Sequence, residues 1–126
     1  MYFRFQTSIR CRQTGRALGI FRTAGRLEDE GRVESYLIDS LRQTTAWFNK
    51  NLPVPRHDSI DPRSLFWFDA RNPESMNRIW DLVIWLRICD VHVTEIKCRD
   101  PGSIVYRDDL QVAAMPSARV CRQLKL

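Results

Sequence analysis

Hydrophobic and polar residues follow two different periods in the first half of the chain. Residues 2–9 (YFRFQTSI) alternate with a period of two, which predicts a strand with one buried face. From Gly31 apolar residues recur every three or four positions, which predicts a helix that ends near Asn51, just before a proline-containing loop. The expected buried face of this helix consists of Val33, Tyr36, Leu37, Leu41, Thr44, Trp47 and Phe48. Residues 16–28 fit either a short helix or a strand, because their glycines weaken both interpretations.

A continuous apolar run opens the second half of the chain. Residues 64–70 (SLFWFDA) place four apolar side chains in succession, which is typical of a strand inside a sheet with both faces covered. Asn72, Pro73 and Glu74 then supply an N-cap, a proline at the first helical position and an acid in the first turn. This start predicts a helix that runs to about Cys89. Its expected apolar face consists of Met76, Ile79, Trp80, Val83, Ile84 and Leu86 or Arg87.

The last third of the chain has the pattern of an antiparallel meander. Strands are predicted over residues 91–98, 103–107 and 110–115. Pro101 and Gly102 suit the two central positions of a type II turn between the first two of these strands.

The order of elements predicts an α+β fold. We expect a single compact domain over residues 1–115, with a mostly antiparallel four- or five-stranded sheet and two main helices packed on it. Residues 116–126 are expected to form a basic C-terminal tail that can fray. The 126 residues are 44% hydrophobic and 28% charged, which is an ordinary globular composition. Without a signal-peptide pattern or a long apolar run, the chain is expected to be soluble and cytoplasmic, with reduced thiols and no membrane partner.

Positive charge is concentrated at the two ends. Of the net charge of +5, residues 1–27 supply six arginines and no acid, and the tail adds three basic residues and no acid. The residues between them carry eleven basic and fifteen acidic side chains, 11 − 15 = −4. Arginine forms bidentate contacts with phosphate and carboxylate, which favours an acidic partner, either protein or nucleic acid. Seventeen of the twenty basic residues are arginine, and a GC-rich genome is the alternative explanation for that ratio. A merely solvated basic face is the alternative to nucleic-acid binding. The candidate nucleic-acid or anion-binding residues are Arg4, Arg10, Arg12, Arg16, Arg22, Arg26, Arg119 and Arg122.

Tyr2 and Arg4 share one face of the first predicted strand. Alternation of aromatic and basic residues occurs on sheets that bind single-stranded nucleic acid. This pattern favours nucleic acid as the partner.

Motifs for catalysis and metal binding are sparse. Cys89, His92 and Cys98 lack the two tight pairs of a structural zinc site. A fourth ligand would have to come from Cys11, Cys121 or His57. No nucleophile motif, phosphate-binding loop or dinucleotide fingerprint occurs. We therefore predict no metal, no cofactor and no catalytic residue.

The junction between residues 64–70 and the following helix offers the best remaining site. Asp69 and Arg71 lie beside a helix N-terminus, whose free N–H groups favour an anion. Asn72 and Glu74 can satisfy those donors themselves. The sequence therefore favours a capping role with a surface ion pair over an anion-binding or catalytic role.

Two resemblances accompany these patterns. The segment SIVYRDDLQVA resembles the terminal strands of small toxin ribonucleases of the RelE type. That resemblance implies a metal-independent ribonuclease in which Arg99, Tyr106 and Arg107 approach the RNA. The segments GIF, AWFNKNLPVP and PGSIVYRDDLQVAAMP resemble small bacterial proteins of no known activity, which implies a compact single domain and supplies no catalytic residue.

The patterns together favour a non-enzymatic binding or regulatory module whose arginine-rich N-terminal segment and tail engage an acidic partner. The alternative is the ribonuclease just described. The tryptophan-bearing helices could also support a homodimer, although covering a sheet is their ordinary role.

Overall fold

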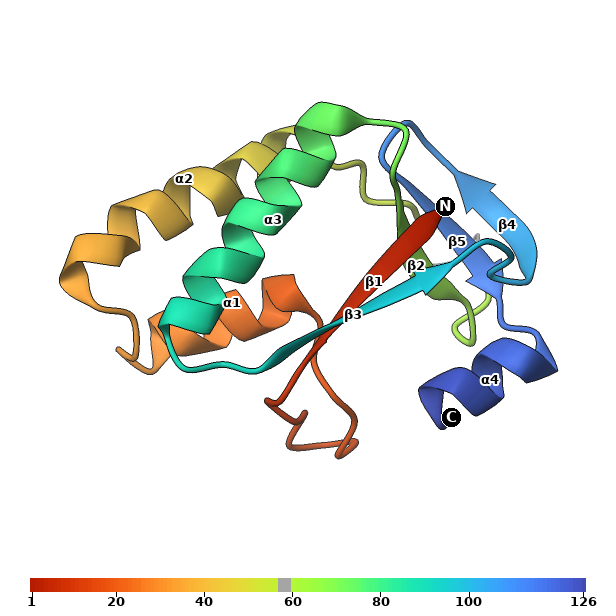
Figure 1. Cartoon of the computed structure of the whole chain (residues 1–126), viewed down its shortest axis with the longest axis horizontal. Coiled ribbons are helices and arrows are strands. Elements are labelled where there is room, and N and C mark those ends of the chain that lie inside the picture. Colours follow the sequence, from red (N-terminus) through yellow and green to blue (C-terminus); the bar gives the residue numbers. More distant parts are fainter. Residues whose placement is uncertain (57–59) are drawn as a thin grey trace. The chain divides into compact units, whose positions relative to one another are not determined.

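The computed structural model describes residues 1–56 and 60–126 and confirms an α+β fold (Figure 1). The elements are β1 (Tyr2–Thr7), α1 (Ile20–Asp29), α2 (Ser35–Asn51), β2 (Leu65–Asp69), α3 (Pro73–Ile88), β3 (Val93–Cys98), β4 (Ser103–Arg107), β5 (Gln111–Met115) and α4 (Ala118–Leu124). No helix in this part of the chain is both long enough and apolar enough to cross a membrane.

The five strands form one sheet in the order β3-β1-β2-β5-β4. The meander predicted for the last three strands is therefore wrong at β3, which lies beside β1 at the opposite edge from β4. β2 pairs antiparallel with β1 on one side and with β5 on the other, so the prediction that residues 64–70 lie inside the sheet is confirmed. The prediction that both of its faces are covered is wrong at Phe66, whose surface is 39% exposed, whereas Trp67 is 1% exposed. An uninterrupted apolar run does not reveal which of its two faces is covered.

The described chain divides into two compact units. Unit 1 comprises Met1–Arg4, Pro53–Met76 and Lys97–Leu126, and unit 2 comprises Phe5–Leu52 and Asn77–Ile96.

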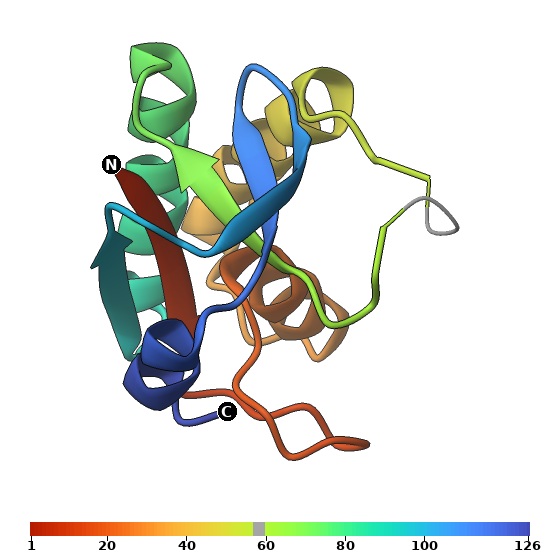
Figure 2. The same cartoon turned by 90° about the vertical axis from the view of Figure 1, so that its right-hand side faces the viewer.

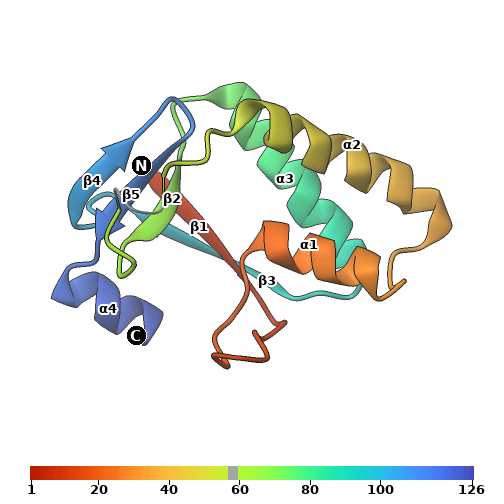
Figure 3. The same ribbon diagram turned by 180° about the vertical axis from the view of Figure 1, so that it is seen from behind.

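In unit 2, α1 and α2 pack against each other (Figure 3). The rings of Phe21 and Phe48 meet edge to face at 4.9 Å between centroids. The hydroxyl groups of Thr7 and Thr23 form a buried hydrogen bond of 2.7 Å, which ties α1 to the end of β1. The ambiguous segment 16–28 is therefore helical from Ile20 onward.

Gly31 ends α1 and does not begin the next helix. Its φ of +66° is the left-handed conformation that glycine adopts after a helix, and its N–H donates to the carbonyl of Glu28. α2 begins at Ser35. Its buried residues are Leu37, Leu41, Thr44 and Phe48, but Tyr36, predicted on this face, is 72% exposed.

The predicted apolar face of α3 also needs correction. Ile79, Leu82, Val83 and Leu86 are fully buried, whereas Ile84 is 47% exposed. Leu82 and Ile84 are both apolar, so hydrophobicity alone could not predict which of the two is buried. Helical spacing from Ile79 favours Leu82, because residues three apart lie on one face.

Two of the three tryptophans in the helices, Trp80 and Trp47, have partners inside unit 2. Trp80 meets Phe5 edge to face at 5.3 Å between ring centroids, and Arg78 lies over the ring of Trp47. A homodimer through these helices stays a prediction.

In unit 1, β4 and β5 form a hairpin, and β2 lies beside β5 (Figure 2). The turn before β4 contains Gly102 with a φ of +116°, as a type II turn requires at this position. A Cβ atom at Gly102 would lie 2.0 Å from the carbonyl oxygen of Met115. Only glycine therefore fits this turn without displacing the backbone.

The predicted basic tail contains α4. Ser117 caps the helix by accepting a hydrogen bond from the N–H of Val120 at 3.1 Å. α4 buries Val120 and Leu124 and exposes Arg119 and Arg122. Its amphipathic pattern explains why these eleven residues contain an ordered element.

Candidate anion-binding surfaces

A short hairpin in unit 2 carries three of the predicted arginines. Arg10 and Ala17 form a β-bridge, and the N–H of Cys11 donates to the carbonyl of Arg16 at 2.8 Å. Gly15, with a φ of +70°, closes the turn. The side chains of Arg10, Arg12 and Arg16 are exposed. The backbone of this hairpin is held by hydrogen bonds, while its arginines extend into solvent.

One carboxylate faces several arginines beside this hairpin. Arg12 and Arg26 both contact Glu30 Oε1 at 3.1 Å, and Arg32 contacts Oε2 at 3.4 Å. These contacts, with those of Arg26 the strongest, lower the pKa of Glu30 below its usual value. Glu30 is therefore ionised at neutral pH, and its one carboxylate contacts three guanidinium groups.

We name the arginines of the hairpin and of α1, together with Glu30 and Arg32 just after α1, the arginine-loop surface. It consists of Arg10, Arg12, Arg16, Arg22, Arg26, Arg32 and Glu30. The side chains of Arg10, Arg16 and Arg22 form no ion pair with any residue in the described part of the chain. Cys11 lies among these arginines, and its pKa is lowered to about 7, mainly by hydrogen bonds from Thr14 and also by the charge of Arg22.

Arg4, one of the predicted anion-binding residues, contacts the sheet in unit 1, and its role in binding stays a prediction. Its guanidinium lies over the Trp67 ring at 5.6 Å from the centroid, and Nη1 donates to the carbonyl of Phe66 at 2.7 Å. Burial lowers the pKa of Arg4. The eight predicted arginines thus fall into different units: Arg4, Arg119 and Arg122 lie in unit 1, and the other five lie in unit 2.

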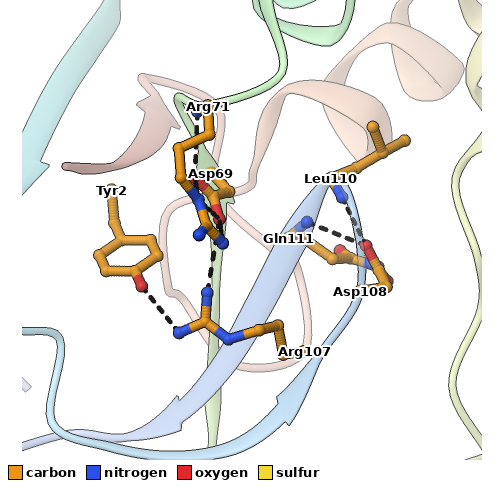
Figure 4. Close-up of polar contacts among 7 residues, drawn as sticks. All are labelled: Tyr2, Asp69, Arg71, Arg107, Asp108, Leu110 and Gln111. Carbon is orange, nitrogen blue, oxygen red and sulfur yellow. Dashed lines mark hydrogen bonds and ion pairs between the residues drawn. The ribbon is translucent and has the colours of Figure 1, made fainter.

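A second cluster in unit 1 joins Asp69, Arg71, Arg107 and Tyr2 (Figure 4). Arg71 donates to Asp69 from its backbone N–H at 3.0 Å, from Nε at 3.0 and 3.1 Å, and from Nη2 at 2.6 Å. Arg107 Nη1 lies 3.5 Å from Asp69 Oδ2, and Arg107 Nη2 donates to the hydroxyl of Tyr2 at 3.0 Å. We name these four residues the Asp69 cluster.

The sheet register explains how these residues meet. Tyr2 lies opposite Asp69, while Trp67 and Arg107 both lie opposite Val112. Residues directly opposite in antiparallel strands share a face, as do alternate residues along a strand. Tyr2, Asp69 and Arg107 therefore lie on one face, at the ends of β1, β2 and β4.

Burial of the Asp69 side chain, which is 3% exposed, would raise the pKa of its carboxyl. The hydrogen bonds from Arg71 and the charge of Arg107 outweigh burial and lower that pKa overall. The helix start is satisfied separately, because Asn72 Oδ1 accepts from the N–H of Ser75 at 3.0 Å. The sequence indicated the pair Asp69–Arg71 and the cap, but no local signal linked Arg107 to them.

Tyr106 has a different role from its neighbour Arg107. Its hydroxyl donates to Asp108 at 2.7 Å, and this contact raises the pKa of Tyr106 to about 12. Tyr106 pairs with Ala113 whereas Arg107 pairs with Val112, so the two side chains lie on opposite faces of β4. They are not placed to act on one phosphate group.

The potential metal ligands do not gather in the residues that the structure describes. Over residues 1–56 and 60–126, no group of three or more His, Cys, Asp or Glu side chains could hold a metal ion. His57 lies outside the described residues.

The Cys89 thiol has a raised pKa. Burial is the main cause, and the charge of the nearby Glu34 adds to it.

Comparison with known proteins does not identify a family. The sequence matches no protein-family model, and neither the curated proteins nor the solved structures contain a significant match.

Proposed function

We propose that the protein is a non-enzymatic, cytoplasmic binding module whose arginine-loop surface engages the phosphate backbone of single-stranded nucleic acid. The exposed arginines of α4, Arg119 and Arg122, form a further basic surface that contributes to the same binding.

The observation that carries the proposal is the surplus of cations on the ordered hairpin. Three exposed arginines project from eight residues that contain no acid, and among the described residues only Arg12 of these three forms an ion pair, with Glu30. When such arginines contact a phosphate backbone, they release its condensed counterions, and this release favours binding. Such contacts carry no base specificity, so a sequence-tolerant binding mode is expected.

The test is the salt dependence of binding to a single-stranded RNA oligonucleotide, followed by fluorescence anisotropy. Each phosphate contact to a single strand contributes a slope of about −0.7 in log K against log[salt], so the triple variant R10Q/R12Q/R16Q should reduce the slope by about 2. The matched control is K50Q/R63Q/R99Q, which removes three exposed basic residues elsewhere.

Equal slopes for the two triple variants would remove the arginine-loop surface as the binding site. Poly-glutamate serves as the second probe. Binding to poly-glutamate without binding to RNA would contradict a nucleic-acid partner and indicate an acidic protein.

The ribonuclease alternative receives little support from the contacts of Tyr106. With a pKa of about 12 and its hydroxyl bound to Asp108, Tyr106 is a poor general base at neutral pH. RNA cleavage in the presence of a chelator that disappears in Tyr106→Phe would nevertheless establish this alternative.

A further inference from the structure

The same local motif occurs twice in unit 1. Asp61-Pro62-Arg63 and Asp69-Ala70-Arg71 each place an arginine two residues after an aspartate, and in both the arginine donates from its backbone N–H, Nε and Nη2. The Asp61 side chain is 34% exposed, and Arg63 is its only ion-pair partner among the described side chains. The Asp69 side chain is 3% exposed and is joined by a second arginine, Arg107.

The second arginine leaves the Asp69 cluster with unused positive charge. Two guanidinium groups face one carboxylate, a formal balance of 2 − 1 = +1. Asp108 does not restore neutrality at this point, because its carboxylate accepts from the N–H groups of Leu110 and Gln111 and is turned away from both guanidinium groups (Figure 4). The cluster is therefore locally cationic.

Hydrogen-bond donors also remain. A guanidinium carries five N–H donors, and Arg71 Nη1 makes no hydrogen bond within the described part of the chain. The Tyr2 oxygen accepts from Arg107, so the hydroxyl proton of Tyr2 is left to donate. The arginine side chains are accessible to a ligand, at 72% exposed for Arg71 and 42% for Arg107.

We propose that Arg71, Arg107 and Tyr2 bind the phosphate group of a phosphate monoester or of free phosphate. A phosphate monoester presents three terminal oxygens, and free phosphate four, to three separate donor groups, whereas a carboxylate presents two. Asp69, buried beneath the arginines, holds their guanidinium groups in place before the ligand arrives, which reduces the entropy lost on binding. The site lies within unit 1 and does not depend on the arginine-loop surface of unit 2.

The experiment is an NMR titration of the full chain with inorganic phosphate and, separately, with adenosine monophosphate, against chloride at equal ionic strength. Saturable shifts are expected at the backbone N–H of Arg71 and at the side-chain Nε–H of Arg71 and Arg107. Tyr2→Phe should weaken phosphate binding about tenfold, because it removes one charge-assisted hydrogen bond and keeps the ring. Arg107→Lys should weaken binding at least as much. Arg63→Lys is the matched control and should leave the affinity unchanged.

Two results would overturn the proposal. The first is wild-type chemical shifts that change linearly with phosphate concentration and equally with chloride. The second is an equal loss of phosphate affinity in Arg63→Lys and Arg107→Lys. The amide spectrum of each variant shows whether it is folded. If Arg107→Lys does not fold, Tyr2→Phe still tests the proposal. Tighter binding of adenosine monophosphate than of inorganic phosphate would identify an ester as the ligand. Equal binding would show that the phosphate group alone is recognised.

Discussion

The two Asp-x-Arg motifs provide an internal test of what burial and tertiary contacts add to an ion pair. Asp69→Asn and Asp61→Asn make the same chemical change in the same local geometry. A pair two residues apart can also form in the unfolded chain, so its local part contributes little to the free energy of unfolding. Only Asp69 has tertiary contacts in addition, because its carboxylate is buried and approaches Arg107, which is 38 residues away in sequence (107 − 69 = 38).

The expected loss for Asp69→Asn is about 2 kcal/mol, the range for a buried hydrogen bond to a charged group. An Asn side chain keeps one acceptor but turns an NH2 group toward the arginines, so part of the network is replaced by donors facing donors. The melting temperature should fall by about 6 °C in a chain of this size. Asp61→Asn, an exposed pair that solvent screens, should lose much less.

Urea denaturation of both variants at several pH values checks this. The pKa of Asp69 is lowered in the folded state, so its contribution is present above the unfolded value of about 4 and declines as the pH falls below it. The difference between wild type and Asp69→Asn should therefore shrink in acid. A loss no larger than that of Asp61→Asn, or a difference that does not change with pH, would refute the reasoning.

Further outcomes follow from burial, backbone geometry and a thiol pKa. Leu82→Ala should cost about 2–5 kcal/mol in urea denaturation, because Leu82 is 0% exposed, whereas Ile84→Ala, at a position 47% exposed, should cost under about 1 kcal/mol. Gly102→Ala should cost at least about 1–3 kcal/mol, because its φ is +116° and a Cβ would meet a backbone carbonyl; Gly25→Ala, in an open helical position, should stabilise by about 0.5–1 kcal/mol. The rate of Cys11 alkylation by iodoacetamide should rise with pH with a midpoint near 7, because the pKa of the thiol is about 7. A midpoint near the usual cysteine value of about 8.5 would contradict the hydrogen bonds from Thr14.

Local chemistry was sufficient to predict several elements of the fold. Asn72-Pro73 is a self-contained helix start, and the structure places the N-cap hydrogen bond at Asn72. Pro101-Gly102 predicts a turn, and Gly102 has the positive φ that such a turn needs. These features depend on residues within one turn of each other, which is why the sequence alone reveals them.

Other features needed partners from distant parts of the chain. Residues 16–28 carry a pattern that fits two structures, and the helix over Ile20–Asp29 is fixed by packing against α2 and by the bond from Thr23 to Thr7. Arg4 was predicted to bind an anion because of its strand position. The structure adds a contact with Trp67, 63 residues away (67 − 4 = 63), and the anion-binding role stays a prediction.

The Asp69 cluster shows most clearly which contacts the sequence reveals and which ones need the tertiary structure. The sequence by itself determined that Asp69 and Arg71 stand together at a strand end, and that arginines gather without acids in residues 1–27. Only the tertiary structure decided that Arg107 and Tyr2 join Asp69, because this depends on the register of β1, β2, β5 and β4. Register is set by many weak side-chain contacts summed over several strands, and no single stretch of the chain encodes it.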